Sequence, residues 1–275
     1  MRMYWPGFRK VRRQVCRRIT RRIRELDLPA DGYRAYLETH PEEWQELDRR
    51  CRITISRFYR DKGVFEFLGR VVLPRLAGTL IDHEEKLLRI WSAGCGSGEE
   101  PYSLALLWDR QLRSSYPSLD IDILGSDVDP ALLERAQNAC YAYASIRELP
   151  AEWIESEFTR IDGMYCLNSA HKENVRYIEH DVRTAAFNEP FDMIMCRNLV
   201  FTYFDQALQL EVLHTLANRL RSGGVLVIGA HENLPVNADD LTMWSGVHKV
   251  YRKTARSVAG CKPCNSADPP VATST

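Results

Sequence analysis

The sequence of 275 residues lacks the features of several structural classes. No apolar run approaches the roughly 18 residues that a membrane-spanning helix needs, and the N-terminus has no apolar core of the kind that a secretion signal carries. The eight cysteines are scattered, without the spacing of a disulfide framework, which is typical of proteins in a reducing compartment. We therefore predict a cytoplasmic protein that does not insert into a membrane.

The first 24 residues contain no acidic residue, although the whole chain balances 37 Lys and Arg against 37 Asp and Glu. Ten basic residues lie in this segment, so the rest of the chain has a formal charge of −10. Residues 8–26 carry one apolar stripe at helical spacing and predict an amphipathic helix whose other faces are arginine. Such a helix favours docking on an acidic partner, through Arg13, Arg17, Arg21 and Arg24. A solvated face and a mitochondrial presequence are the alternatives.

Secondary-structure patterns divide the chain into two domains and a tail. Further short helices at 31–37 and 41–50 complete a helical N-terminal domain, residues 1–78. A second domain, 79–255, alternates short apolar runs (87–91, 121–124, 175–178, 191–196 and 225–228) with helical stretches (99–113, 130–140 and 205–221). This alternation predicts an α/β fold with a parallel sheet covered on both faces.

Three smaller features lie within or after the second domain. Asp162-Gly163 has the usual signal of a two-residue hairpin, which predicts a short β insertion at about 157–174. Residues 243–254 predict a final strand, with a reversal before it that would make it antiparallel. Residues 256–275 have the composition of a disordered tail, in which we expect Cys261 and Cys264 to be free thiols rather than a metal site.

A glycine-rich turn, Gly94-Cys-Gly96-Ser-Gly98, follows the first strand of the second domain. Its glycines let the backbone approach a ligand, and the following helix offers free amides. Glu99 and Glu100 at the start of that helix would repel a pyrophosphate but attract a cationic ligand without phosphate. S-adenosylmethionine, with its sulfonium and ammonium groups, is such a ligand. Helix capping by the two glutamates is the alternative.

Carboxylates also end the next two strands. Asp127, beside the glycine turn, is placed to accept hydrogen bonds from both ribose hydroxyls of the cofactor. Asp129-Pro130 has the pattern of a helix cap and first helical residue. Asp181 would hold the adenine amino group, or cap a turn.

Four segments, in chain order, resemble the CheR family of chemoreceptor protein-glutamate O-methyltransferases: WSAGCGSGEEPYSLAL, GSDVDPALLERAQNACY, FDMIMCRNLVFTYFD and RSGGVLVIGAHENL. ITISRFYRD is similar to a further family motif, and the resemblance extends to about residue 254. It implies a Rossmann-like class I methyltransferase sheet, a small all-helical N-terminal domain whose basic helix faces the substrate, and an inserted β-subdomain. The subdomain is short here, so we predict no docking of a receptor tail peptide.

The resemblance also implies site residues, position by position. Arg60, Arg197 and Tyr203 would be catalytic, with Arg197 and Tyr203 flanking the methyl group and the incoming carboxylate. The residues predicted to bind S-adenosylmethionine are Ser56, Arg60, Gly94, Gly96, Gly98, Glu99, Asp127, Asp181, Asn198 and Leu199. No metal is expected.

Two motifs depart from the family pattern. Four residues, 199–202, separate Asn198 from Tyr203 where the family has three, so either the loop bulges and Tyr203 keeps its place, or Phe201 takes it. His231-Glu232-Asn233 is one residue shorter than the family's His-Ser-Glu-Asn, and we expect His231 to be structural.

Methyl transfer to an ionised glutamate needs alignment rather than acid–base help, so Arg60 or Arg197 would grip the acceptor carboxylate. The predicted protein is a monomeric S-adenosylmethionine-dependent methyltransferase acting on acidic chemoreceptor helices. Two alternatives remain open: a related enzyme with a small-molecule or non-receptor acceptor, and a non-catalytic regulatory or nucleic-acid-binding module. Under the methyltransferase hypothesis, which we favour, we expect no nucleic-acid partner.

Overall fold

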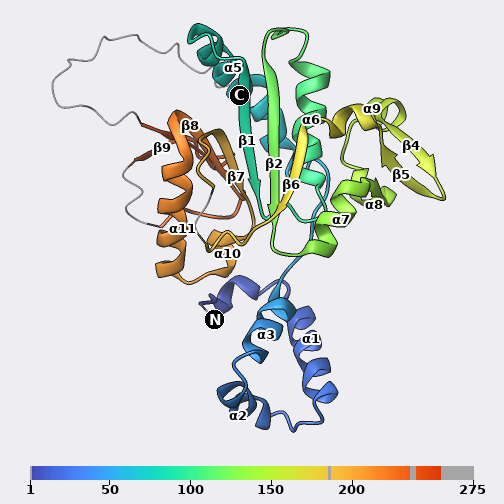
Figure 1. Cartoon of the computed structure of the whole chain (residues 1–275), viewed down its shortest axis with the longest axis vertical. Helices are drawn as coiled ribbons and strands as arrows, with labels where there is room; N and C mark the ends of the chain where they lie inside the picture. Colours follow the sequence, from blue (N-terminus) through green and yellow to red (C-terminus); the bar gives the residue numbers. More distant parts are fainter. Residues whose placement is uncertain (1, 185–186, 236–239, 255–275) are drawn as a thin grey trace, which may run out of the picture.

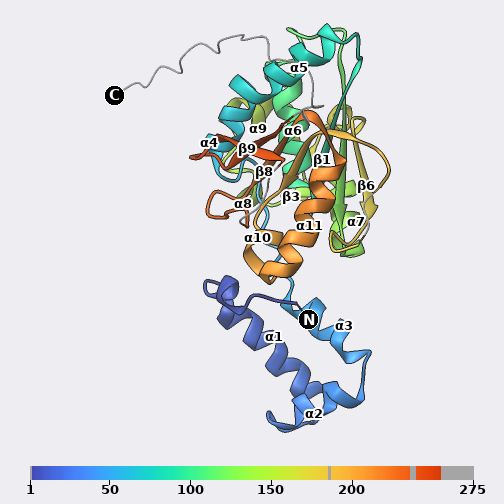
Figure 2. The ribbon, with the colours of Figure 1, turned by 90° about the vertical axis from the view of Figure 1, so that its left-hand side faces the viewer.

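The computed structural model describes residues 2–184, 187–235 and 240–254. An N-terminal lobe projects from the main body (Figures 1 and 2). The lobe consists of η1 (Trp5–Phe8), α1 (Arg12–Glu25), α2 (Gly32–Thr39) and α3 (Glu43–Cys51).

The next helices belong to the main body by their packing. They are α4 (Lys62–Phe67), the π-helical turn η2 (Leu68–Val72) and α5 (Leu73–Asp82). Their apolar side chains share one core cluster with Leu88 and Ile90 of the first sheet strand. The domain boundary at residue 78 stays a prediction, but the packing changes earlier, after α3.

A seven-stranded sheet forms the centre of the body, in the order β6-β2-β1-β7-β8-β10-β9. The parallel strands are β1 (Leu87–Ala93), β2 (Asp120–Asp127), β6 (Val175–Glu179), β7 (Phe191–Cys196) and β8 (Leu220–Ile228). β10 (Val250–Lys253) runs antiparallel to β8, and β9 (Leu241–Ser245) antiparallel to β10. The predicted α/β fold is confirmed. The single strand predicted at 243–254 is wrong, because a turn at 246–249 divides it in two.

Helices cover both faces of this sheet. α6 (Glu99–Gln111) packs in the same cluster as α5, while α11 (Gln206–Arg219) packs on the opposite face (Figure 1). Neighbouring β1 residues alternate between the clusters, Ile90 in one and Trp91 in the other, as in a strand buried on both faces. The strand order reverses between β1 and β7, and open α/β sheets bind ligands at the carboxyl ends of strands beside such a reversal.

A small subdomain follows α7 (Pro130–Asn138). It contains β3 (Cys140–Tyr141), α8 (Tyr143–Ile146), α9 (Ala151–Glu157), β4 (Phe158–Ile161), β5 (Met164–Leu167) and η3 (Ser169–Lys172). Asp162 and Gly163 form the β4–β5 turn with φ of 48° and 80°, so the predicted hairpin is confirmed. The sequence analysis missed β3, which pairs antiparallel with β5.

Cys140 and Cys166 form a disulfide within the subdomain, which corrects the expectation of unpaired cysteines. Because β3 and β5 run antiparallel, these residues lie opposite each other despite a sequence separation of 26. Cys16, Cys51, Cys95 and Cys196 are free. Cys261 and Cys264, with the predicted tail, lie outside the described residues.

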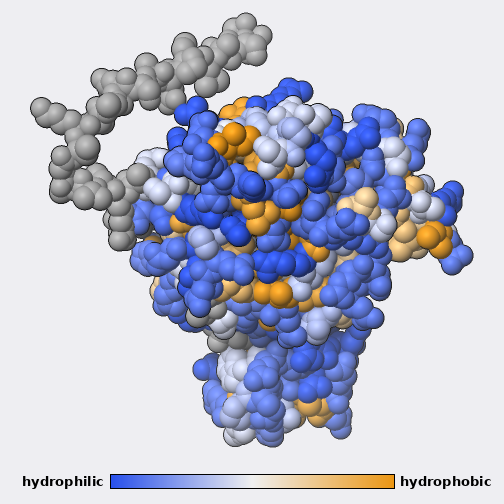
Figure 3. Space-filling model, turned by 45° about the horizontal axis from the view of Figure 1, so that its top comes forward, coloured by the Kyte–Doolittle hydropathy of each residue, from blue (hydrophilic) through white to orange (hydrophobic). Residues whose placement is uncertain are grey.

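The surface in Figure 3 is largely hydrophilic, with apolar residues scattered over it. Within the described ranges, no helix combines the length and apolar character needed to cross a membrane.

Candidate active site

A cavity of about 640 Å³ lies between the carboxyl ends of the parallel strands and the N-terminal lobe. Its walls come from segments that follow β1, β2, β6, β7 and β8, together with residues 3–11 and 51–57. Ten of the predicted site residues line it: Ser56, Arg60, Gly94, Gly96, Asp127, Asp181, Arg197, Asn198, Leu199 and Tyr203. Gly98 and Glu99 are not among its lining residues.

Asp127 lies at the end of β2 against the glycine turn. Its Oδ2 accepts a hydrogen bond from the Gly96 N–H (2.9 Å) and its Oδ1 from the Asp129 N–H (3.0 Å). Burial raises the pKa of Asp127 and these amide bonds lower it, with burial the stronger effect. A carboxylate has about four acceptor positions, so Asp127 can still accept from hydroxyl groups in the cavity, as the binding of a ribose requires.

Glu99 and Glu100 begin α6 but face different surroundings. Glu99 is only 3% exposed, burial raises its pKa, and its Oε2 has no hydrogen-bond partner among the described residues. Gly98 is the N-cap of α6, where an added Cβ would lie 2.8 Å from that of Ala136. Glu100 lines the cavity, and its Oε1 accepts from the Ser92 hydroxyl (2.7 Å). The structure therefore brings Glu100, not the predicted Glu99, to the site.

Arg197 is buried, and both of its terminal nitrogens donate hydrogen bonds within the protein. Nη1 donates to Glu100 (3.0 Å), and Nη2 donates to Asp61 (2.6 Å) and to the Arg60 carbonyl (3.0 Å). Its side chain is 3% exposed. This guanidinium therefore joins α6, the end of β7 and the segment before α4, while its Nε has no hydrogen-bond partner among the described residues.

Arg60 differs from Arg197 in its partners. Its Nη1 donates to the Ile55 carbonyl (2.7 Å), and the described residues give it no carboxylate partner. The guanidinium lines the cavity close to Tyr203: burial raises the pKa of Tyr203, and the positive charge of Arg60 opposes that shift. Arg60 is therefore available to bind a carboxylate.

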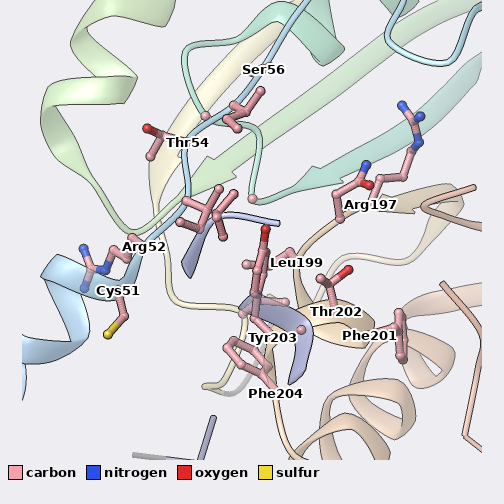
Figure 4. A pocket seen from close by; sticks show the side chains of 18 of the residues that line it. Cys51, Arg52, Thr54, Ser56, Arg197, Leu199, Phe201, Thr202, Tyr203 and Phe204 are labelled. Carbon is pink, nitrogen blue, oxygen red and sulfur yellow. The ribbon is translucent and has the colours of Figure 1, made fainter. Parts of the chain in front are cut away.

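The longer loop after Asn198 is accommodated by the short helix α10 (Val200–Tyr203). Tyr203 lines the cavity, and its ring packs on Phe8 with centroids 4.8 Å apart. Figure 4 shows Tyr203 projecting into the pocket, and Phe201 also contributes to its wall. Phe201 is 8% exposed and belongs to the core cluster that includes α11. The geometry therefore favours the alternative in which Tyr203 keeps its place.

Asp181 lines the cavity but is engaged by a neighbour. Arg183 donates through Nε and Nη2 to its carboxylate (2.7 to 3.0 Å), and the Arg183 N–H also bonds to Oδ1 (2.9 Å). Burial would raise the pKa of Asp181, but Arg183 outweighs it and lowers the pKa. This contact matches the turn-capping alternative, and the adenine role stays a prediction.

A segment that the sequence patterns do not predict, residues 2–8, covers one side of the site, and we call it the N-terminal strap. The Tyr4 N–H donates to the Tyr203 carbonyl (2.7 Å), and the Asp205 N–H donates to the Arg2 carbonyl (3.0 Å). A Cβ on Gly7 would overlap the Thr202 carbonyl oxygen, so the strap touches α10 with no room for a side chain. No local signal reveals such a long-range contact.

The four predicted docking arginines, Arg13, Arg17, Arg21 and Arg24, are exposed on α1 and do not line the cavity. Within the described residues they have no acidic partner, whereas Arg22 on another face pairs with Glu43 (2.7 Å). Arg9 and Lys10, just before α1, line the cavity.

Residues 54–250 match the family described as CheR methyltransferase, SAM binding domain. The chain belongs to the CheR family. A chemotaxis protein methyltransferase of Listeria monocytogenes is 35% identical over 68% of this chain and 68% of its own. That of Escherichia coli is 30% identical over 81% and 77%, and chemotaxis protein methyltransferase 2 of Vibrio cholerae is 32% identical over 74% and 71%.

This CheR-family protein is therefore an S-adenosylmethionine-dependent methyltransferase. The cavity fits that cofactor, because Asp127 offers free acceptor lone pairs beside a turn whose glycines adopt positive φ. In the part of the chain that the structure describes, no group of three or more His, Cys, Asp or Glu could hold a metal ion. Among solved structures, SAM-bound CalS10 from Micromonospora echinaspora is 19% identical over 60% of this chain and 50% of its own, with a TM-score of 0.34. A TM-score this low gives no further evidence about the fold.

Proposed function

We propose that this CheR-family protein methylates glutamate side chains on acidic helices, namely those of chemoreceptor cytoplasmic domains, and works as a cytoplasmic monomer. The observation that carries the proposal is the exposed arginine stripe of α1, which begins beside the cavity. Three relatives bear the name chemotaxis protein methyltransferase, which supports the same acceptor.

The stripe suits a helical partner in length and charge. Arg13 and Arg24 are eleven positions apart, or roughly 16 Å along a helix that rises 1.5 Å per residue. The arginines recur every three or four positions, so they share one face of α1. Arg9 and Lys10 continue the positive charge to the cavity wall. An acidic helix lying along α1 would thus bring its glutamates to the site.

S-adenosylmethionine supplies a methyl group on a positively charged sulfur. The acceptor glutamate is ionised at neutral pH, so the residues around it need to align it rather than remove a proton. Arg60 would hold one face of that carboxylate and leave an oxygen directed at the methyl carbon. As the O–CH3 bond forms and the S–CH3 bond breaks, opposite charges cancel, and the N-terminal strap limits the access of water.

The test uses a receptor cytoplasmic fragment and cofactor with a tritiated methyl group. We expect labelled methyl ester that releases methanol in alkali. Replacing Arg13, Arg17, Arg21 and Arg24 with Gln should raise KM for the fragment at least about tenfold while the Kd of the cofactor stays unchanged. The control replaces the same number of exposed arginines elsewhere, Arg34, Arg49, Arg70 and Arg147, because it removes equal net charge.

The other outcomes separate the alternatives. A receptor fragment without alkali-labile label would overturn the proposed acceptor, and turnover of a small carboxylic acid would then assign a small-molecule substrate. Duplex or RNA binding that is steeply salt-dependent and needs the α1 arginines would instead support a nucleic-acid-binding module. Asp127→Asn serves as the cofactor control in every assay, since it should abolish calorimetric binding of S-adenosylmethionine.

A further inference from the structure

A buried carboxylate without an assigned role lies directly behind the active-site loop. Glu232 follows β8, is 3% exposed, and does not line the cavity. Its Oε2 accepts hydrogen bonds from the Asn198 N–H (2.8 Å) and the Gly229 N–H (2.6 Å), and its Oε1 accepts from the Thr202 hydroxyl (2.6 Å). Burial raises the pKa of Glu232, whereas these three hydrogen bonds favour its ionised form and oppose the shift.

The groups that Glu232 holds are the two ends of the loop that forms the cavity wall. Asn198 has a left-handed backbone, φ 55°, a region that asparagine enters more readily than most other non-glycine residues. Thr202 immediately precedes Tyr203. One side chain therefore holds the left-handed entry to the loop and the exit that carries the tyrosine.

The surroundings of this contact are closely packed. A Cβ added to Gly229 would lie 2.7 Å from Glu232 Oε2 and 2.9 Å from Asn198 Oδ1. Thr202 lies in the stretch that is one residue longer than the family pattern, and its hydroxyl bonds to Glu232.

We propose that Glu232 is a positioning residue for methyl transfer, acting through Asn198 and Thr202 to hold Tyr203 in register with the cofactor. This inference depends on the methyltransferase reaction and not on the identity of the acceptor. It assigns Glu232 no contact with substrate or cofactor.

The decisive comparison is between Thr202→Val and Thr202→Ser. Valine keeps the shape but lacks the hydroxyl, whereas serine keeps the donor and loses a methyl group. A hydrogen bond to an ionised carboxylate contributes enough to expect a fall in kcat of about 10- to 100-fold for Thr202→Val. Thr202→Ser should stay within about threefold of wild type, and neither change should alter the Kd of S-adenosylmethionine, since Asn198 remains held.

Glu232→Gln should lower kcat as well and weaken cofactor binding, because it disturbs both ends of the loop. The double variant Glu232→Gln/Thr202→Val should be no slower than Glu232→Gln alone, as expected for two residues that act through one contact. Additive losses, or a loss in Thr202→Ser equal to that in Thr202→Val, would overturn the proposal.

An acceptor-independent measurement keeps the test valid even if the proposed receptor acceptor fails. Amide hydrogen exchange of the peptide 196–205 should be at least about tenfold faster in Glu232→Gln, while peptides of α1 exchange as in wild type. Unchanged exchange in 196–205 contradicts the positioning role, whatever the acceptor. A lower unfolding temperature of the Glu232 variant would not affect the test, because amide exchange of 196–205 and kcat report on the loop directly.

Discussion

Two arginines of the active site illustrate how partners decide a residue's role. The sequence alone predicts Arg197 and Arg60 equally well as the residue that binds the acceptor carboxylate. Arg197 is bonded to Glu100 and Asp61 and is nearly inaccessible, whereas Arg60 donates to a carbonyl and faces the cavity. An arginine fork already satisfied by two carboxylates has little left to offer a third. The structure thus favours Arg60 for carboxylate binding and Arg197 for holding the wall together.

The geometry predicts different consequences for replacing these arginines. Arg60→Lys keeps the charge but loses the two-pronged grip, so we expect kcat/KM to fall about 10- to 100-fold, and Arg60→Ala to fall further. Both variants should unfold at nearly the wild-type temperature, because Arg60 has no ion pair to lose. Arg197→Lys, the comparison, should lower the unfolding temperature by several degrees, since a lysine in this buried position cannot pair with Glu100 and Asp61 together. Wild-type activity in Arg60→Ala would remove Arg60 from the mechanism.

Much of the site could be predicted at the residue scale, for a physical reason. Asp127 and the glycines at 94 and 96 occupy positions fixed by the end of a strand, so the pattern placed them correctly in the cavity. The sequence does not distinguish Glu99 from Glu100. Successive side chains of a helix point about 100° apart, and the sequence does not show which of the two directions faces the cavity. The role of Tyr203 stays a prediction, although its place in the cavity agrees with one of the two alternatives.

At the scale of elements, the subdomain is joined to α6 by a buried ionic cluster. His171 in η3 bonds through Nδ1 to Asp109 of α6 (2.7 Å) and through Nε2 to Glu157 at the end of α9 (2.6 Å). Burial alone would lower the pKa of His171, but the two carboxylates outweigh it and raise that pKa. Their own pKa values are lowered by His171 in spite of burial. The imidazolium is therefore the form that joins the three elements.

This cluster predicts how stability varies with pH. A raised folded-state pKa means that the contribution of His171 is complete below its ordinary value of 6.5 and is lost as the pH rises through the raised value. Urea unfolding of wild type and His171→Gln should differ by about 3 kcal/mol at pH 6, and this difference should shrink as the pH rises through the raised pKa. His214→Gln, an exposed histidine on α11, is the control. A difference that does not change with pH would show that His171 acts by packing alone.

The subdomain also shows which elements sequence patterns miss. The β4–β5 hairpin was predicted because Asp-Gly is a strong local turn signal. β3 has two residues, and what makes it a strand is its pairing with β5 and the bond from Cys140 to Cys166, both of which are long-range. The N-terminal strap was missed for the same reason, since its partners lie about 200 positions away.

At the scale of the whole molecule, the lobe and the body meet across the cofactor cavity. Arg183, after β6, donates through Nη1 and Nη2 to Asp48 of α3 (2.8 and 3.1 Å) while it also bonds to Asp181. Arg52 adds a bond from the lobe side to the Val128 carbonyl (3.4 Å). Both contacts border the cavity, so they hold the lobe against the body at this site.

Asp48→Asn tests whether this connection closes the site. The amide keeps the shape of the carboxylate but removes a charge from a bidentate pair, so the lobe should open more often. We expect the calorimetric Kd of S-adenosylmethionine to rise about tenfold and trypsin to cleave faster at Arg52 and Arg57, in the segment that joins lobe and body. Glu46→Gln breaks ion pairs within the lobe, to Arg49 and Arg50, and should change neither quantity. If Asp48→Asn binds the cofactor as wild type does while its linker is cleaved faster, the lobe does not contribute to cofactor affinity, and its role is limited to presenting α1 to the acceptor.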